Sequence, residues 1–236
     1  MAENNLKNSN GNEVVPFAIK DCALAAIAIG KRAQNLRELR DNLETIHQGS
    51  IYYHFWGGLL RPRFDDPEYN NDFAGWARHG LHDSRLAERL GVIDPTDFVD
   101  IEDLRRELID VIEERLDESE LIPWSKGDQQ FHFIRSQIFV FDTYKRIDTP
   151  EELALAVPQM SISSIFYHFI DARRRTEESI DDFEAWLIGF GSKHKGLYNK
   201  IAAIDPYFIS LSELRQQLTD LFNCHFNIEA KGGVCK

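Results

Sequence analysis

The stretch "SIYYHF" at residues 50–55 recurs as "SIFYHF" at residues 164–169. Sliding the sequence by 114 residues aligns residues 17–55 with residues 131–169 without a gap, and ten of the 39 aligned pairs are identical. Average residue frequencies would give about two or three identities by chance. We therefore predict two tandem copies of one unit of about 100 residues, which is too long for a solenoid repeat.

This register predicts how the chain is divided. Residues 14–116 form the first repeat unit and residues 131–226 form the second. Residues 117–130 are polar, contain Pro and Gly, and are expected to be a linker. The Asn-rich residues 1–13 are expected to be disordered, and residues 227–236 are expected to be a flexible tail.

Helix start signals recur at equivalent positions in the two copies. Asn35 and Thr149 are each followed three residues later by a glutamate, which is the spacing of a capping box, so helices should begin at residues 36 and 150. Asp100 and Ser210 likewise precede amphipathic segments that are expected to be the final helix of each copy. A further helix is predicted from the Asn pair at residues 70–71 to Gly91.

The recurring hexapeptide predicts a central helix in each copy. The segment "IYYHFWGGLL" at residues 51–60 follows a Ser that can cap a helix, and it is apolar on every side, which predicts a buried helix. Upstream, "DCALAAIAIG" (residues 21–30) is Ala-rich and favours helix, whereas its counterpart "SQIFVFDTY" (residues 136–144) has strand propensity. We expect a short extended segment at residues 17–20 and 131–134, each followed by a short helix.

These observations predict a mainly α fold class. The expected architecture is two tandem repeated helical units of about five helices each, with one short extended segment per unit, packed about a pseudo-two-fold axis.

Composition excludes several classes of function. The net charge of −12 and the isoelectric point near 5.1 oppose a nucleic-acid partner, because that affinity comes mostly from Lys and Arg on phosphates. No signal peptide and no run of about 18 apolar residues is present, so we expect a cytoplasmic protein with no membrane partner. Cys22, Cys224 and Cys235 lack CxxC spacing, which indicates reduced thiols and no metal site.

The leading candidate site is a pair of equivalent residues in each copy: Tyr53 and His54, and Tyr167 and His168. In one interpretation they are metal ligands or acid–base groups near the junction of the copies. In the other, each is a neutral core imidazole that fixes the packing through a hydrogen bond. The structural interpretation ranks first, because buried polar groups usually have partners.

Basic residues form a second candidate site, for an anion. A matched basic cluster could bind phosphate or carboxylate through guanidinium contacts. The alternative, which we favour, is that each pair complements the dipole in the last turn of a helix. Similarly, "HGLHD" (residues 79–83) has ligand-like spacing but is better explained as an exposed helix face. The candidate anion-binding residues are Lys31, Arg32, Arg61, Lys145, Arg146 and Arg175.

The order of these motifs resembles a known family. The sequence S-I-Y-Y-H, then N-D-F-x-x-W, then I-D-P, then L-R-x-x-L is similar to an uncharacterised prokaryotic family catalogued as domain of unknown function 5752. The similarity covers each copy from residue 17 to about 116 and from residue 131 to about 222. The second copy departs from it at residues 180–181, Ile-Asp in place of Asn-Asn. The resemblance implies kinship and no chemistry.

Two hypotheses for function follow. The first is a cytosolic non-enzymatic interaction or regulatory module built from a duplicated helical domain, with a protein partner and a monomeric or homodimeric state. It rests on the absence of catalytic motifs such as GxSxG or GxGxxG, so no catalytic residue and no cofactor is assigned. The alternative is a protein that binds a metal or a small anion at the junction of the two repeats, with or without catalysis at that site.

Overall fold

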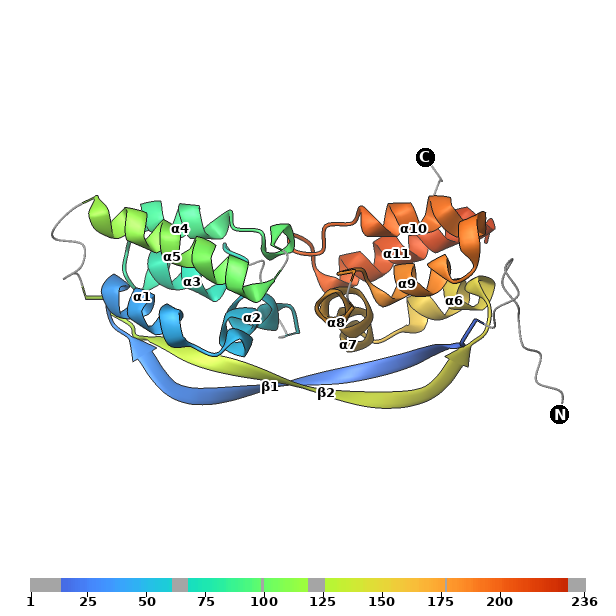
Figure 1. The fold of residues 1–236 in the computed structure, drawn as a ribbon, viewed down its shortest axis with the longest axis horizontal. Helices are drawn as coiled ribbons and strands as arrows, with labels where there is room; N and C mark the ends of the chain where they lie inside the picture. The colour runs from blue at the N-terminus through green and yellow to red at the C-terminus, as the bar shows by residue number, and fades with distance from the viewer. Residues whose placement is uncertain (1–13, 61–67, 99, 119–125, 177, 229–236) are drawn as a thin grey trace. The chain divides into compact units, whose positions relative to one another are not determined.

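The computed structural model describes residues 14–60, 68–98, 100–118, 126–176 and 178–228 (Figure 1). Helices accompany a two-stranded antiparallel sheet in which β1 pairs with β2. In chain order the strands and α-helices are β1 (Phe17–Ala33), α1 (Leu36–Thr45), α2 (Gln48–Trp56), α3 (Asp72–His79), α4 (Ser84–Gly91), α5 (Ile101–Asp117), β2 (Phe131–Ile147), α6 (Pro150–Ala156), α7 (Ile162–Ile165), α8 (Ala172–Arg175), α9 (Asp182–Ile188), α10 (Lys195–Ala202) and α11 (Leu211–Phe226).

Several predicted segments lie outside the described residues. These are the predicted disordered N-terminus at residues 1–13, residues 119–125 of the predicted linker, and residues 229–236 of the predicted tail. Among the described residues, no helix is both long enough and apolar enough to span a membrane.

The predicted mainly α fold class, two helical units of about five helices each with one short extended segment per unit, is wrong. Each extended segment continues into a strand of 17 residues, so residues 21–30 are strand and not a short helix. Alanine favours helix by only a few tenths of a kcal/mol per residue over most other residues. In β1, pairing with a partner strand rich in Phe and Ile overrides that preference.

The capping signals predicted the first helix of each half correctly. α1 begins at Leu36 with Asn35 as its N-cap, and α6 begins at Pro150 with Thr149 as its N-cap. The final helices also begin as expected, since Asp100 caps α5 and Ser210 forms a complete capping box on α11.

Two helix predictions need correction. The single helix expected up to Gly91 is two helices, because the chain turns at His82, whose backbone is left-handed with φ 58°. The caps of the central helices are His47 and Ser161, so these helices begin before the expected Ser50 and Ser164. α7, a π-helical turn at Phe166–Asp171 and α8 follow one another without a break.

The chain divides into two compact units. Unit 1 consists of residues 1–23 and 140–236, and unit 2 consists of residues 24–139. Each strand therefore starts in one unit and ends in the other. The start of β1 belongs to the unit that contains α6–α11, and the start of β2 belongs to the unit that contains α1–α5.

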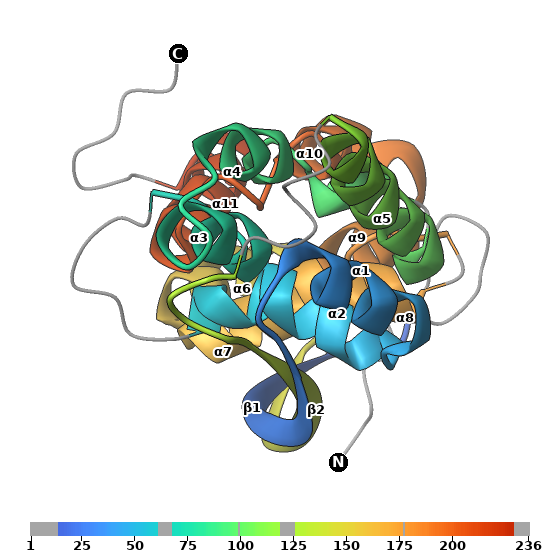
Figure 2. The same cartoon turned by 90° about the vertical axis from the view of Figure 1, so that its left-hand side faces the viewer.

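Within unit 2, α2 lies beside the strands and α3 lies farther from them (Figure 2). The core is built from helix stripes at three- and four-residue spacing, such as Leu36, Leu39 and Leu43 of α1, all buried. Phe131 and Phe133 of β2 are also buried in this unit.

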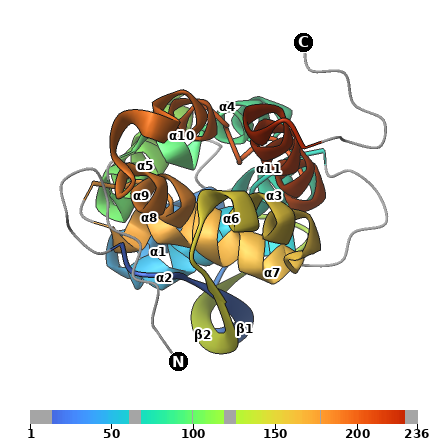
Figure 3. The same ribbon diagram turned by 90° about the vertical axis from the view of Figure 1, so that its right-hand side faces the viewer.

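Within unit 1, α7 lies beside the strands and α11 lies farther from them (Figure 3). Leu214, Leu218 and Phe222 of α11 are completely buried. Phe17 and Ile19 of β1 complete this core from the other end of the chain.

Candidate functional site

His54 lies on α2 and is buried in unit 2. Its Nδ1 is 2.8 Å from Oδ2 of Asp72, and its Nε2 accepts the backbone N–H of Ile134 at 3.2 Å. Because Nε2 accepts a hydrogen bond it carries no proton, so Nδ1–H donates to the Asp72 carboxylate. The imidazole therefore joins a helix N-terminus to the start of β2.

His168 repeats this arrangement in unit 1. Its Nδ1 is 2.7 Å from Oδ2 of Asp182, and its Nε2 accepts the backbone N–H of Lys20 at 2.9 Å. Burial raises the pKa of Asp182, but the hydrogen bond from His168 and the charge and hydrogen bond of Arg175 outweigh it, so this pKa lies below its ordinary value. Asp182 is therefore ionised at neutral pH and holds His168 in one tautomer.

A tryptophan adds a second contact to each strand start. The indole N–H of Trp76 donates to the carbonyl of Gln129 at 2.7 Å, and that of Trp186 donates to the carbonyl of Val15 at 2.8 Å. The sequence analysis did not predict these two hydrogen bonds. The signal that could have found them is that Val15 and Gln129 are also 114 residues apart.

We call each group of histidine, aspartate and tryptophan a strand clamp. The clamp of unit 2 encloses Phe131, whose ring centroid is 4.7 Å from that of His54 and 5.1 Å from that of Phe73. The clamp of unit 1 encloses Phe17, 4.8 Å from His168. Both nitrogens of each imidazole are engaged, so a metal or a further proton can bind the ring only if its hydrogen bond with the strand or with the aspartate breaks. Within the described ranges, no group of three or more His, Cys, Asp or Glu side chains could hold a metal ion.

The two predicted tyrosines stand next to the clamps. Tyr53 lies in unit 2 with its ring edge-on to His54. Tyr167 lies in unit 1, where the guanidinium of Arg175 stacks on its ring at 4.0 Å. Burial raises the pKa of Tyr167. Each Tyr-His pair thus lies inside its own unit, and its histidine contacts the start of a strand. A functional site at these residues stays a prediction.

The candidate anion-binding residues are distributed over both units. Lys31 and Arg32 lie at the end of β1 in unit 2, and Lys145 and Arg146 lie near the end of β2 in unit 1. The favoured explanation for these pairs, the last turn of a helix, is therefore wrong, since their positions are in strands. Arg61 lies outside the described residues.

Some of these cations already have partners in the fold. The guanidinium of Arg175 is 3.0 Å from carboxylate oxygens of both Asp171 and Asp182, and Arg146 pairs with Asp142 at 2.6 Å. Arg175 thus pairs with the buried carboxylate of Asp171 and with the half-buried carboxylate of Asp182 in the clamp of unit 1.

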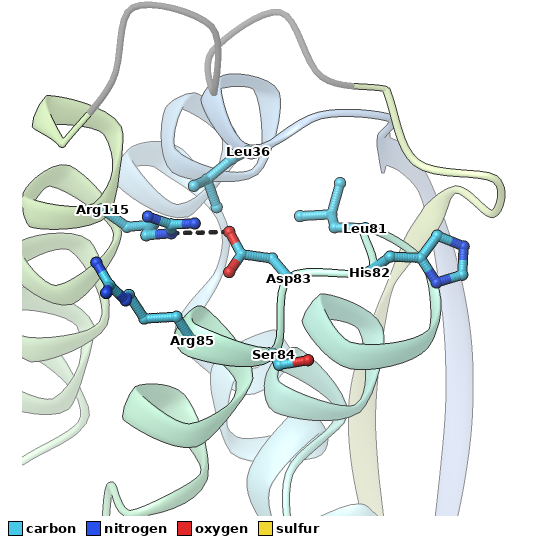
Figure 4. Close-up of a pocket in the computed structure, with 7 residues that line it drawn as sticks. All are labelled: Leu36, Leu81, His82, Asp83, Ser84, Arg85 and Arg115. Atoms are coloured by element: carbon cyan, nitrogen blue, oxygen red, sulfur yellow. Dashed lines mark hydrogen bonds and ion pairs between the residues drawn. The ribbon is translucent and has the colours of Figure 1, made fainter.

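The last three residues of "HGLHD", Leu81, His82 and Asp83, line a pocket of about 390 Å³ in unit 2 (Figure 4). Asp83 accepts a hydrogen bond from Arg115 at 2.8 Å, and His82 points away from it toward Asp128, with Nε2 and Oδ2 2.7 Å apart. Arg85 and Arg115 also donate to Glu118, and the hydrogen bond from Arg85 is the main cause that lowers the pKa of Glu118 to about 2. Because both arginines already have carboxylate partners, we assign no class of ligand to this pocket.

Comparisons with known proteins agree with this fold. The sequence model of a family described as "Family of unknown function (DUF5752)" matches residues 14–223 as one stretch. Among solved structures, the chain is similar to "The structure of OrfY from Thermoproteus tenax", with 27% sequence identity and a TM-score of 0.78, over 90% of this chain and 96% of that chain. No curated protein matches the chain.

Proposed function

Since this chain belongs to the DUF5752 family of unknown function, we propose that it is a cytosolic, non-enzymatic interaction module whose partner-binding surface is the exposed stretch of β2 at residues 139–144. The single observation that carries the proposal is the exposure of large apolar side chains along this stretch.

Four large side chains of this stretch face solvent. The exposed fraction is 52% for Phe139, 46% for Val140, 54% for Phe141 and 86% for Tyr144. Single exposed apolar residues are normal on protein surfaces, but several large ones close together along one strand indicate a binding surface or an aggregation hazard. Aromatic residues are also enriched in the cores of protein interfaces.

Backbone strain at Tyr144 adds independent support. Its φ is 59°, in the left-handed region, where a bulky residue is an outlier. The position 114 residues earlier, Gly30, has φ 75°, and glycine adopts that conformation at no steric cost. The second strand therefore keeps a tyrosine where the geometry favours glycine, although this tyrosine is mostly exposed. Strained residues of this kind cluster at functional sites.

The buried polar groups support a role other than catalysis. The imidazoles of His54 and His168 hold strand starts, and the carboxylates of Asp72 and Asp182 hold the imidazoles. Burial, followed by the charges of Asp171 and Asp21, raises the pKa of Cys22 to about 12, so this thiol is not a nucleophile at neutral pH.

We further propose that the chain consists of two tandem copies of the family unit. The supporting observation is that the strand clamps use equivalent residues with equivalent hydrogen bonds. A second pair supports it: Cys22 Sγ donates to the carbonyl of Ser163, and Ser136 Oγ, 114 residues after Cys22, donates to the carbonyl of Gly49.

A peptide library displayed on phage tests the proposed surface. The full chain should enrich binding peptides, and the triple variant Phe139→Ser, Phe141→Ser, Tyr144→Ser should lose them while its circular dichroism spectrum is unchanged. The matched control replaces three exposed apolar residues elsewhere, Val92→Ser, Leu155→Ser and Phe208→Ser, and should keep them. Enrichment that is equal for both triple variants, or no enrichment by the parent, would refute the proposal.

A further inference from the structure

The outer edge of β2 has the properties of a strand acceptor. The sheet has two strands, so within the described chain each strand has one edge without a strand neighbour. Natural proteins protect such edges with charged residues or proline. Residues 136–141 of β2, "SQIFVF", contain neither, and they are rich in residues that favour strands. This segment is therefore suited to pair with another extended chain.

The charge of the ribbon differs in sign from that of the chain. β1 and β2 together contain six Lys or Arg residues and two Asp residues, whereas the whole chain has a net charge of −12. Close to the exposed stretch, Lys145 and Arg146 are exposed. Arg146 forms an ion pair with Asp142, whereas Lys145 forms no ion pair with the described residues. A positive, apolar ribbon on an acidic protein selects a partner with the opposite local charge.

We infer, on the basis of the proposed function, that the partner is an extended acidic segment of another polypeptide, with apolar residues at alternate positions, which adds to the edge of β2 as a third strand. Main-chain hydrogen bonds would supply affinity, and the alternating side chains would contact Phe139 and Phe141 on one face and Val140 on the other. Acidic residues of the segment would lie near Lys145.

A second copy of this chain fits the surface less well. Two copies would bring two ribbons of the same positive charge together, so the local charge opposes association. An acidic peptide meets the ribbon with a favourable charge.

The probe is a capped peptide of roughly ten residues, the upper range of natural strand lengths, with Glu and Val at alternate positions. Fluorescence anisotropy measures its binding to the full chain at low and physiological salt. We expect binding that weakens as salt rises, and at least about tenfold weaker binding of a matched Lys-Val peptide. A Glu-Val peptide that is N-methylated at every backbone nitrogen should not bind, because neither of its edges can donate to the ladder.

Two protein variants locate the site. Lys145→Glu should weaken binding of the acidic peptide about tenfold, whereas Lys195→Glu, an exposed lysine on α10 of the same unit, should leave it unchanged. Binding should also slow hydrogen exchange of amides in residues 136–143.

Other outcomes overturn the inference. The inference is wrong if the chain prefers the Lys-Val peptide or if the two lysine variants have equal effects. It is also wrong if a duplex oligonucleotide of equal charge binds more tightly than the acidic peptide. Self-association through β2 would assign the edge to a second copy. If the phage library yields peptides that depend on residues 139–144 but are helical or basic, this inference fails and the proposed function stands. If no peptide depends on those residues, both fail.

Discussion

At the scale of single residues, the two halves differ most informatively at Asn71 and Asp181, the N-caps of α3 and α9. In unit 2, Asn71 accepts the N–H of Ala74 and donates its amide to the carbonyl of Leu90 at 2.9 Å. In unit 1, Oδ1 of Asp181 accepts the N–H of Glu184, but its buried Oδ2 has no partner among the described residues. Unit 1 thus has a carboxylate where unit 2 has an amide, and one oxygen of that carboxylate is buried without a donor among the described residues.

Burial raises the pKa of Asp181 to about 7 in the folded chain. A raised folded-state pKa means that stability is highest below the ordinary pKa of 3.8, decreases as pH rises toward 7, and is constant above it. We predict that Asp181→Asn increases the free energy of unfolding at pH 8, by up to about 4 kcal/mol, and changes it little near pH 4. Urea denaturation at several pH values measures this difference.

The reciprocal variant is the control. Asn71→Asp should place an unpaired carboxylate in unit 2 and destabilise the chain at pH 8 more than at pH 4. If the effect of Asp181→Asn does not depend on pH, the carboxyl group of Asp181 titrates normally and this account of the cap is wrong.

Tyr144 gives a second prediction at this scale. Tyr144→Gly relieves the left-handed backbone, which costs a non-glycine residue about 1 to 2 kcal/mol, and loses part of that gain to the entropy of glycine. We expect the free energy of unfolding to rise by about 0.5 to 1 kcal/mol, measured by urea denaturation.

The equivalent position provides the matched comparison. A Cβ at Gly30 would meet no atom within 4 Å, so Gly30→Ala reports the backbone alone and should destabilise the chain by about 1 kcal/mol. Destabilisation by Tyr144→Gly would mean that the tyrosine is kept for packing and not for binding.

At the scale of elements, the strand clamps connect helices to strands. Removal of the His54 or His168 ring leaves a cavity among aromatic rings and breaks two hydrogen bonds, one with a strand N–H and one with a carboxylate. We predict that His54→Ala and His168→Ala each lower the free energy of unfolding by about 2 to 4 kcal/mol. Thermal unfolding should show a lower melting temperature for both, with and without a chelator.

His79→Ala is the control, because this side chain is 64% exposed, and it should be nearly neutral. A melting temperature of the buried-histidine variants at or above that of the parent, or a difference that the chelator removes, would favour a metal or catalytic role for these residues.

Much at this scale could be predicted from the sequence. Caps such as Asn35 and Thr149 are local signals, so the first residues of α1 and α6 were correct. The repeated hexapeptide also identified His54 and His168. Their hydrogen-bond partners could not be predicted from the sequence. Asp72 and Asp182 lie 18 and 14 residues away, and the other partner of each histidine is a backbone N–H more than 70 residues away. The strand at residues 21–30 was missed because only its pairing partner overrides the alanine preference for helix.

At the scale of the whole molecule, each unit is completed by the strand start that the other half of the sequence supplies. The chain path explains why. Residues 127–129 stay on unit 2 through hydrogen bonds with Gln34, Gly80 and Trp76, so β2 must begin there. Since α6 belongs to unit 1, β2 must end there, and β1 follows the opposite course.

The repeat alone could not reveal this exchange. Phe17 with Ile19 and Phe131 with Phe133 are similar apolar pairs, so by sequence either pair could fill either clamp. The peptide segment that reaches each clamp is decided by chain connectivity, which residue types do not encode.

Hydrogen exchange of the full chain carrying Phe17→Ala or Phe131→Ala tests this exchange most directly. Phe17 packs on His168, Phe183 and Trp186, so its loss should speed exchange at least about tenfold in residues 162–188 and leave residues 48–79 unchanged. Phe131→Ala should have the opposite pattern. Faster exchange in residues 48–79 of the Phe17→Ala variant, with residues 162–188 unaffected, would contradict the account.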